Sequence, residues 1–276
     1  MSENHLSTSL CSLLRSLESC LVAYSGGVDS VLLAFLAHRE LGDRALAVIA
    51  DSPSLPRREL EEALAIGERF GFPVRVVRTT EFDNADYLNN PPNRCYFCKH
   101  ALFTDLARIA TAEGFKTIAY GENLSDLGDF RPGSQAAAEF SVRAPLKEAG
   151  LTKDAIRALS RELGLPTAEK PQAPCLSSRI PHGQAVTMEK LARVEAAEAW
   201  LHDLGLREVR VRHHETGEDG RIARVELGSD EMRRVAEESL WYRIDVRMRE
   251  LGFTDAVLDE RGYRRGSLNP VNPAGA

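Results

Sequence analysis

Short apolar runs alternate with amphipathic stretches through the first half of the chain. The runs over residues 21–24, 45–50, 74–77 and 117–120 predict strands. The run over residues 45–50 is almost entirely apolar, as expected for a parallel strand covered on both faces. Apolar residues at helical spacing predict helices over residues 13–17, 31–41, 59–70 and 101–113. This alternation predicts βαβ units and an α/β fold with a doubly wound parallel sheet.

The pattern changes after a helix that Thr152 caps and that ends near Leu163. Prolines at 166, 171 and 174 predict an irregular linker. The elements expected beyond it are a helix from the cap Thr187 to Leu204, hairpin strands over 208–213 and 221–227, a helix over 231–251 and a strand over 256–258. We predict a first domain over residues 1–166, a smaller α+β domain over 167–268, and a disordered tail over 269–276.

Composition limits the class of protein. The chain has 276 residues, of which 43% are hydrophobic and 28% charged, enough for one large or two modest domains. No apolar run approaches the roughly 18 residues that a membrane helix needs, and the N-terminus lacks the features of a secretory signal. We therefore expect a cytoplasmic protein without a membrane partner. The net charge of −6 disfavours extended binding to nucleic acid.

The turn after the first apolar run carries the strongest chemical signal. It reads Ser25-Gly26-Gly27-Val28-Asp29-Ser30 and leads directly into a helix. Paired glycines let backbone N–H groups approach an anion, and the helix N-terminus adds its positive dipole end. The serine hydroxyls would contact phosphates and Asp29 would hold Mg²⁺. Because the lysine of a Walker A loop is missing, the sequence predicts a pyrophosphate-binding loop of another kind. The pattern Ser-Gly-Gly-x-Asp-Ser resembles the PP-loop of ATP pyrophosphatases.

A polar segment follows the strand over residues 117–120. It includes Gly121, Asp126, Asp129 and Arg131. The carboxyl ends of parallel strands meet at one edge of a sheet, so these residues are expected near the glycine loop. They are candidates for binding ATP or its metal ion, although a solvated polar loop would have the same composition.

Five cysteines in a chain of this type favour thiol or metal chemistry over a disulfide framework. Cys95 and Cys98 form a single C-x-x-C pair, compatible with a redox dithiol, half of a zinc site or part of an iron–sulfur site. Cys175 lies between prolines and shortly before Arg179, whose positive charge favours a thiolate. The sequence therefore marks Cys175 as a candidate for sulfur chemistry.

Arginines supply candidate anion-binding groups. Arg210 and Arg212 are two residues apart in an expected strand, so they share one face and could clamp an anion. Arg179 could pair with a phosphate or carboxylate in the same way. On spacing alone, Arg210 and Arg212 also suit the solvent face of an edge strand.

Together, the glycine loop, the Asp126-x-x-Asp129-Phe-Arg131 segment, Cys175-Leu-Ser-Ser-Arg179 and Val209-Arg-Val-Arg212 resemble the LarE family of ATP-dependent sulfur transferases. The resemblance extends from the glycine loop to about Ser267. It implies that the protein adenylates pyridinium-3,5-biscarboxylic acid mononucleotide, releases pyrophosphate and forms a thiocarboxylate during nickel-pincer cofactor biosynthesis. It also implies a homo-oligomer, by analogy a hexamer.

The resemblance assigns roles to individual residues. Ser25, Gly26, Gly27 and Ser30 would hold the ATP phosphates, and Asp51 and Ser52 would lie near the adenosine. Arg210 and Arg212 would bind the substrate phosphate with Arg179 nearby. Glu198 would be an active-site acid, although a solvated helix glutamate would fit the same position.

The sulfur source is where this sequence departs from the simplest family pattern. In the self-sacrificing form, one cysteine, here Cys175, donates its sulfur and becomes dehydroalanine. Cys95 and Cys98 stand where that form has other residues. We therefore favour a [4Fe–4S] cluster on Cys95, Cys98 and Cys175, with a cluster-bound sulfide as the donor.

Three other functions compete with this interpretation. The first is thiolation of a transfer RNA base, which also uses a PP-loop. The net negative charge of the chain disfavours binding to RNA and so counts against this function. An amide-forming synthase would not need the Cys-Leu-Ser-Ser-Arg segment. A nucleotide-sensing module without turnover would not need Asp29 and Cys175.

Overall fold

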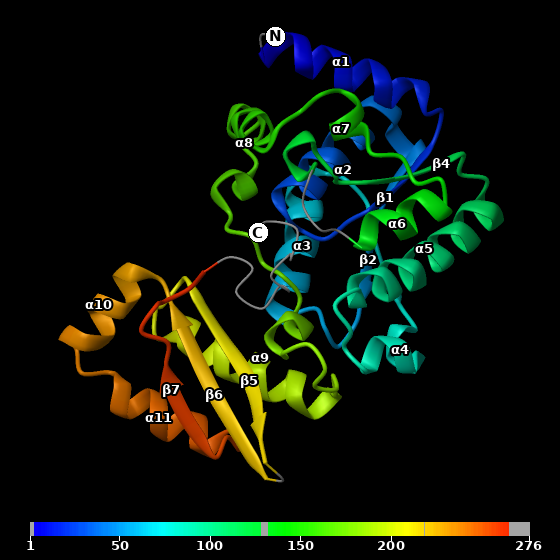
Figure 1. Ribbon diagram of the computed structural model, residues 1–276. Helices are drawn as coiled ribbons and strands as arrows, with labels where there is room; N and C mark the ends of the chain where they lie inside the picture. The colour runs from blue at the N-terminus through cyan, green and yellow to red at the C-terminus, as the bar shows by residue number, and fades with distance from the viewer. Residues whose placement is uncertain (1–2, 128–131, 218, 265–276) are drawn as a thin grey trace, which may run out of the picture. The chain divides into compact units, whose positions relative to one another are not determined.

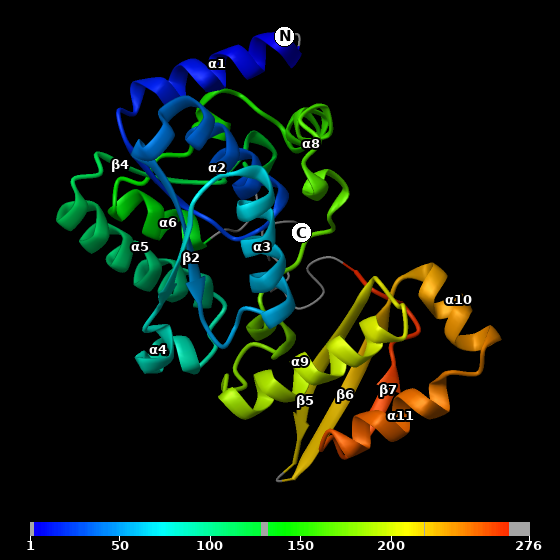
Figure 2. The same cartoon turned by 180° about the vertical axis from the view of Figure 1, so that it is seen from behind.

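The computed structural model describes residues 3–127, 132–217 and 219–264 (Figures 1 and 2). The chain forms two compact units. The first contains the chain up to Asn84 together with Asn93–Ala173, and the second contains Ala85–Pro92 and the chain from Pro174 onward.

The division of the chain differs from the expected one between residues 166 and 167. Residues Pro166–Glu169 form a 3₁₀ helix, η4, that belongs to the first unit. Arg157 on helix α8 (Lys153–Glu162) donates hydrogen bonds to the carbonyls of Ala168 and Lys170, which fastens this segment to the first unit. No feature of the sequence pattern predicts that Ala85–Pro92 belongs to the second unit.

The first unit is built on a parallel sheet of four strands in the order β3-β2-β1-β4. The strands are β1 (Cys20–Ala23), β2 (Ala45–Asp51), β3 (Val74–Arg78) and β4 (Thr117–Tyr120). The chain moves from β1 to β2 and β3 on one side and returns to β4 on the other side. The predicted doubly wound sheet is therefore confirmed, and β1 and β4 flank its switch point, where ligands bind in such folds.

Both faces of the sheet are covered. In β1, Cys20 and Val22 belong to one hydrophobic core, while Leu21 and Ala23 belong to the other. The first core is shared with helices α1 (Glu3–Ser16), α2 (Val28–Leu41), α3 (Arg57–Phe70), α7 (Pro145–Glu148) and α8; the second is shared with α5 (Arg94–Glu113) and α6 (Pro132–Glu139). Two-sided burial explains why the central strands β1 and β2 are continuous apolar runs.

Helix α5 begins earlier than predicted. The expected start near residue 101 is wrong, because the helix runs from Arg94 to Glu113 and ends at Gly114 with φ of 78°. Pro91 and Pro92 lie just before it, where they disfavour helix, so the helix starts as soon as the prolines are passed. Cys95 and Cys98 therefore lie near its beginning.

The second unit is a three-stranded sheet in the order β5-β6-β7 with helices packed on it. The predicted hairpin is confirmed, because β5 (Val209–Thr216) and β6 (Gly220–Leu227) pair antiparallel, and β7 (Asp255–Leu258) pairs parallel to β6. Helix α9 (Met188–Asp203) follows Thr187, whose side chain accepts a hydrogen bond from the N–H of Lys190 as an N-cap.

The single helix expected over residues 231–251 is wrong. The chain forms α10 (Ser229–Glu237) and α11 (Trp241–Glu250), separated at Ser239, which has φ of 51°. Val235 and Leu240 are both buried, and the N–H of Leu240 donates to the carbonyl of Val235 across the turn. Burying both side chains required the helix to break.

The remaining elements are short. They are η1 (Gly42–Arg44), η2 (Glu81–Asp83), α4 (Ala85–Leu88), η3 (Leu124–Asp126) and η5 (Leu176–Arg179). Across the described ranges, each helix falls short of the length and apolar character that crossing a bilayer requires.

Candidate active site

The glycine loop lies between β1 and α2, at the carboxyl end of the sheet. Gly26 has φ of 72°, and a Cβ added to it would lie 2.8 Å from the Cβ of Ala63. Both the conformation and the close approach therefore require glycine here. Gly27 is the N-cap residue of α2, and within the described ranges no side chain caps this helix end, so the first N–H groups of the helix are suited to binding an anion.

The two loop serines hold the turn together. The N–H of Ser25 donates to the Oγ of Ser30 at 3.1 Å, and the two hydroxyl oxygens lie 3.0 Å apart. The Ser30 hydroxyl also donates to the carbonyl of Gly27 at 3.1 Å. The loop is thus closed by its own side chains, a preorganised turn of the kind that phosphate binding requires.

Asp29 is held from two directions. Lys153 at the start of α8 places its Nζ 2.5 Å from one carboxylate oxygen, and the Nδ2 of Asn123 donates to the other at 3.3 Å. A Cβ on Gly121 would lie 3.0 Å from the Cβ of Asp29, so the end of β4 passes close to the loop. The structure therefore brings Gly121 to the loop, as the position at the switch point suggested.

The other residues predicted at this edge make local contacts. Asp126 accepts a hydrogen bond from the N–H of Asn123 in the capping box of η3. Asp51 at the end of β2 pairs with Arg57 at 2.5 Å, and the Oγ of Ser52 accepts from the N–H of Ser54 at 3.0 Å. Asp129 and Arg131 lie outside the described residues.

Two lysines that the sequence analysis did not identify contact the loop. Lys153 pairs with Asp29, and the Nζ of Lys170 lies 3.4 Å from the carbonyl of Gly26. Lys170 also pairs with Glu59 at 2.7 Å and Glu62 at 3.1 Å. Neither lysine forms a motif with the loop along the chain. The only sequence signal was the cap at Thr152, which marks where α8 begins but not what its first side chain contacts.

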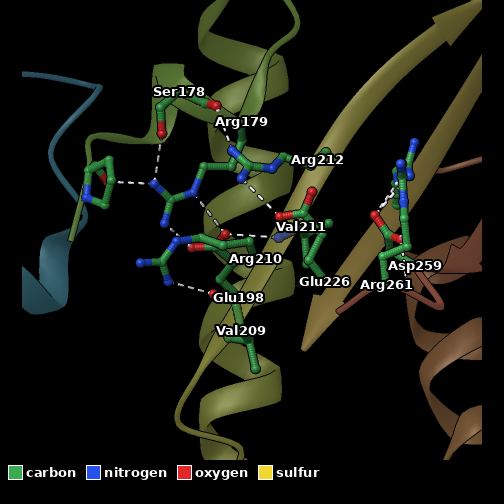
Figure 3. Close-up of polar contacts among 12 residues, drawn as sticks. Ser178, Arg179, Glu198, Val209, Arg210, Val211, Arg212, Glu226, Asp259 and Arg261 are labelled. Atoms are coloured by element: carbon green, nitrogen blue, oxygen red, sulfur yellow. Dashed lines mark hydrogen bonds and ion pairs between the residues drawn. The ribbon is translucent and has the colours of Figure 1, made fainter. Parts of the chain in front are cut away.

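In the second unit, Arg179 organises the segment that contains Cys175, and Figure 3 shows its contacts with Ser178 and Glu198. Its Nε and Nη2 each donate to one oxygen of Glu198 at 2.9 Å. Its Nη1 donates to the carbonyls of Pro174 and Cys175 and to the Ser178 hydroxyl. Burial alone would lower the pKa of Arg179, but the paired Glu198 carboxylate raises it above the usual value. One charged side chain thus fixes the backbone of the cysteine segment to α9.

Glu198 also reaches strand β5. Its Oε1 accepts a hydrogen bond from the N–H of Val211 at 2.9 Å, in addition to the two bonds from Arg179. Val211 stands between the two predicted clamp arginines, so Glu198 joins the cysteine segment to the strand that carries them. From the sequence, Glu198 could also have been a solvent-exposed glutamate on a helix. That alternative is wrong, because only 6% of Glu198 is exposed.

Arg210 and Arg212 lie on one face of β5, opposite the core residues Val209 and Val211. Both side chains are buried. The alternative that they lie on the solvent-exposed face of an edge strand is therefore wrong. Arg212 pairs with Glu226 at 2.9 Å and donates to the carbonyl of Ser178 at 2.8 Å.

Arg210 lies over the ring of Tyr263, with 5.0 Å between the guanidinium carbon and the ring centroid. Burial, together with the positive charges of Arg179 and Arg212, lowers its pKa below the usual value. Among the described residues, Arg179 pairs with Glu198 and Arg212 pairs with Glu226. Three guanidinium groups gathered around this network suit the binding of an anionic ligand.

The cysteines of the predicted cluster are distributed over the two units. Cys95 and Cys98 lie one turn apart on α5 in the first unit, while Cys175 precedes η5 in the second unit. Cys98 and Cys175 are half-buried and Cys95 is exposed. Within the part of the chain that the structure describes, no three His, Cys, Asp or Glu side chains form a group able to hold a metal ion. The cluster therefore stays a prediction.

Comparison with known proteins identifies relatives along nearly the whole chain. The chain is 43% identical over 255 residues to the uncharacterised protein slr1717 of Synechocystis, with 92% of this chain and 93% of that protein covered. It is 35% identical over 263 residues to pyridinium-3,5-bisthiocarboxylic acid mononucleotide synthase of Lactiplantibacillus plantarum, with 94% and 92% covered.

A more distant similarity concerns part of the chain. The chain is 30% identical over 199 residues to the glutamine-hydrolysing GMP synthase of Bartonella quintana, with 63% of this chain and 38% of that protein covered. No protein-family model matches the sequence. The two long matches, taken with the glycine loop and the arginine-linked cysteine segment, show that the chain belongs to the LarE family, which includes pyridinium-3,5-bisthiocarboxylic acid mononucleotide synthase.

Proposed function

We propose that the protein is an ATP-dependent sulfur transferase that converts pyridinium-3,5-biscarboxylic acid mononucleotide into its thiocarboxylate in nickel-pincer cofactor biosynthesis. Family membership supports the substrate class. The observation that carries the proposal is the hydrogen-bond network of Arg179, which joins the Cys175 segment to Glu198 and through it to the strand of Arg210 and Arg212. A cysteine and an anion clamp sharing one network suit a sulfur transfer to a phosphorylated substrate.

The first step would activate the substrate carboxylate. A carboxylate oxygen attacks the α-phosphorus of ATP, the bond from that phosphorus to the bridging oxygen breaks, and pyrophosphate leaves with the electron pair. The glycine loop would hold the ATP phosphates through its N–H groups and the hydroxyls of Ser25 and Ser30. Asp29 would hold Mg²⁺, which neutralises phosphate charge when bound.

The second step would replace AMP by sulfur. A sulfur nucleophile attacks the acyl carbon, the carbon–oxygen bond to AMP breaks, and AMP leaves with the electron pair. Activation is needed because AMP is a far better leaving group than the oxygen of a free carboxylate. Arg210 and Arg212 would hold the substrate phosphate, and Arg179 would keep the Cys175 segment in position through its contacts with the backbone.

We propose Cys95, Cys98 and Cys175 as ligands of a [4Fe–4S] cluster. Three thiols suit such a cluster. Cys95 and Cys98 would supply two of the ligands from neighbouring turns of α5. When bound to these three cysteines, such a cluster would supply the sulfide for the transfer. In the alternative, the Cys175 sulfur forms the thioester with the acyl carbon, a base removes the Cα proton of Cys175, and the Cβ–Sγ bond breaks. The sulfur then leaves with the electron pair as the product thiocarboxylate, and Cys175 becomes dehydroalanine.

Anaerobic purification tests the sulfur source. A brown protein with about four irons and four sulfides per chain supports the cluster, and Cys95→Ala should then lose both iron and activity. A colourless protein whose Cys175 loses the mass of H₂S after turnover supports self-sacrifice. The transferase proposal itself is overturned if the wild type, given ATP and the mononucleotide, releases neither AMP nor pyrophosphate.

A further inference from the structure

The glycine loop lacks the lysine with which a Walker A loop neutralises phosphate charge. In the described part of the chain, two ammonium groups contact the loop from outside its own sequence, those of Lys153 and Lys170. Their other partners decide which of the two is able to turn toward a triphosphate.

Lys170 is already committed to two carboxylates. Its Nζ lies 2.7 Å from Glu59 and 3.1 Å from Glu62, and its side chain is 12% exposed. The two carboxylates more than neutralise the charge of the Lys170 ammonium group, so this group does not favour binding of a further anion. Lys170 therefore acts as a bridge between the loop and helix α3.

Lys153 pairs with one carboxylate among the described residues. Its Nζ lies 2.5 Å from the Oδ2 of Asp29, and both side chains are 22% exposed. The backbone beneath it is fixed, because its N–H donates to the Oγ of Ser125 at 3.0 Å and Thr152 caps the helix that starts there. The ammonium is thus delivered to the loop by a rigid helix end, but it is held there by one solvent-accessible ion pair.

Asp29 is the loop residue that the proposed function assigns to Mg²⁺. Its oxygens are occupied by Lys153 and by the Nδ2 of Asn123. A metal ion on this carboxylate would replace the ammonium, since two cations compete for the same oxygen. The released ammonium would stay beside the loop, where the phosphates of ATP carry the compensating negative charge.

We propose that Lys153 supplies the phosphate-binding lysine that the glycine loop lacks. Resting on the proposed function, this inference holds that MgATP exchanges the Asp29–Lys153 ion pair for two new contacts. Asp29 then holds the metal ion, and Lys153 binds a phosphate oxygen of ATP. The ion pair is the resting form of the site and keeps both side chains in place until the nucleotide arrives.

Calorimetric titration of the purified full-length chain with MgATP and with adenosine tests this proposal. Lys153→Met should weaken ATP binding by about tenfold or more, as expected for a lost charge-assisted contact, and should leave adenosine binding unchanged. Lys153→Arg should stay within about threefold of the wild type for ATP, because it keeps the charge. The matched control is Lys147→Met, which removes an ion-paired lysine of the same unit that bonds Glu122 rather than the loop.

A second readout is the salt dependence of ATP affinity. It should become shallower in Lys153→Met, since a phosphate contact is lost, whereas a purely structural role would weaken ATP and adenosine binding together. The proposal is overturned if Lys153→Met binds ATP within about threefold of the wild type, if adenosine binding falls equally, or if Lys170→Met alone causes the loss. A wild type that binds no ATP would overturn the proposed function as well, which separates the two failures.

Discussion

The two units hold their charged residues in different ways. In the first unit, Asp29 and Lys153 meet through a single contact, with 22% of each side chain exposed. In the second unit, Arg179 and Glu198 meet through two parallel hydrogen bonds, with 3% and 8% exposed. A partly exposed pair exchanges partners at low cost, whereas breaking a buried pair leaves a charge without solvent or counter-ion. The comparison indicates exchangeable charges at the glycine loop and a fixed framework around Cys175.

The largest effect is expected from breaking the framework. Glu198→Ala leaves the Arg179 guanidinium buried without its carboxylate and removes the acceptor for the Val211 N–H. Loss of one partner of a buried pair costs about 3–5 kcal/mol of unfolding free energy. Both tryptophans of the chain, Trp200 and Trp241, lie in the second unit, so urea unfolding followed by tryptophan fluorescence reports on that unit.

The double variant Arg179→Met with Glu198→Leu is the control for this prediction. It removes both charges, so it should recover part of the stability that the single change loses. If Glu198→Ala unfolds at the same urea concentration as the wild type, the Arg179–Glu198 pair does not hold the structure around Cys175 in place, and the prediction is wrong.

The second unit should also respond to mild acid through His213. This buried ring accepts a hydrogen bond from Arg193, and burial together with the nearby positive charges lowers its pKa to about 4. The unfolded chain binds a proton on this histidine near pH 6.5, while the folded chain stays neutral until about pH 4. The unfolding free energy should therefore be constant above pH 6.5 and fall as the pH drops toward 4.

The slope of stability against pH, measured by tryptophan fluorescence, checks this prediction. His213→Gln keeps a hydrogen-bonding side chain that does not titrate, so it should flatten the profile between pH 6.5 and 4.

In the first unit, three hydrogen-bond donors to Glu122 outweigh its burial and lower its pKa below 4.5. Its contribution is present above pH 4.5 and is lost only below that pH, so the two units should weaken in different windows.

These contrasts show what local sequence reveals and what it does not. The glycine loop was predictable because its conformation depends on adjacent residues, with Gly26 at positive φ and Gly27 at the start of a helix. The caps at Thr152 and Thr187 are local in the same way. Lys153 is separated from Asp29 by most of the first unit, and only the return of the chain through β4 and α8 brings them together.

The framework was also partly hidden. Cys175, Arg179, Glu198 and the two strand arginines were identified from motifs, but their mutual contacts were not. The pairing of Arg179 with Glu198 depends on how η5 and α9 pack, and the burial of Arg212 depends on Glu226 from the neighbouring strand. The break of the helix at Ser239 likewise follows from tertiary burial of Val235 and Leu240, which overrides a continuous helical pattern.

A smaller effect is expected at the backbone of the loop. Gly26→Ala places a Cβ 2.8 Å from Ala63 in a residue with φ of 72°, so strain and crowding should cost about 1–3 kcal/mol of unfolding free energy. Gly27→Ala is the matched control, because its φ is −82° and the nearest atom to its Cβ is 3.6 Å away. Thermal unfolding followed by circular dichroism should show a clearly lower midpoint for the first variant. Equal midpoints would mean that the loop adapts to a side chain at Gly26.

The smallest effect on stability is expected at the exchangeable pair of Asp51 and Arg57. Their side chains are 27% and 45% exposed, so breaking the pair by Arg57→Ala or Asp51→Asn should cost less than about 1 kcal/mol. The two variants remove the same ion pair, but Arg57→Ala also removes the hydrogen bonds from Arg57 to the carbonyls of Ser52 and Leu55, whereas Asp51→Asn keeps them. If Asp51 contacts the adenosine, Asp51→Asn should weaken ATP and adenosine binding alike, because the contact does not involve phosphate. Arg57→Ala should preserve adenosine binding, since it leaves the carboxylate in place and more accessible. An equal loss in both variants would assign the pair to holding the strand end, and the contrast between exchangeable and fixed charges would then fail at this position.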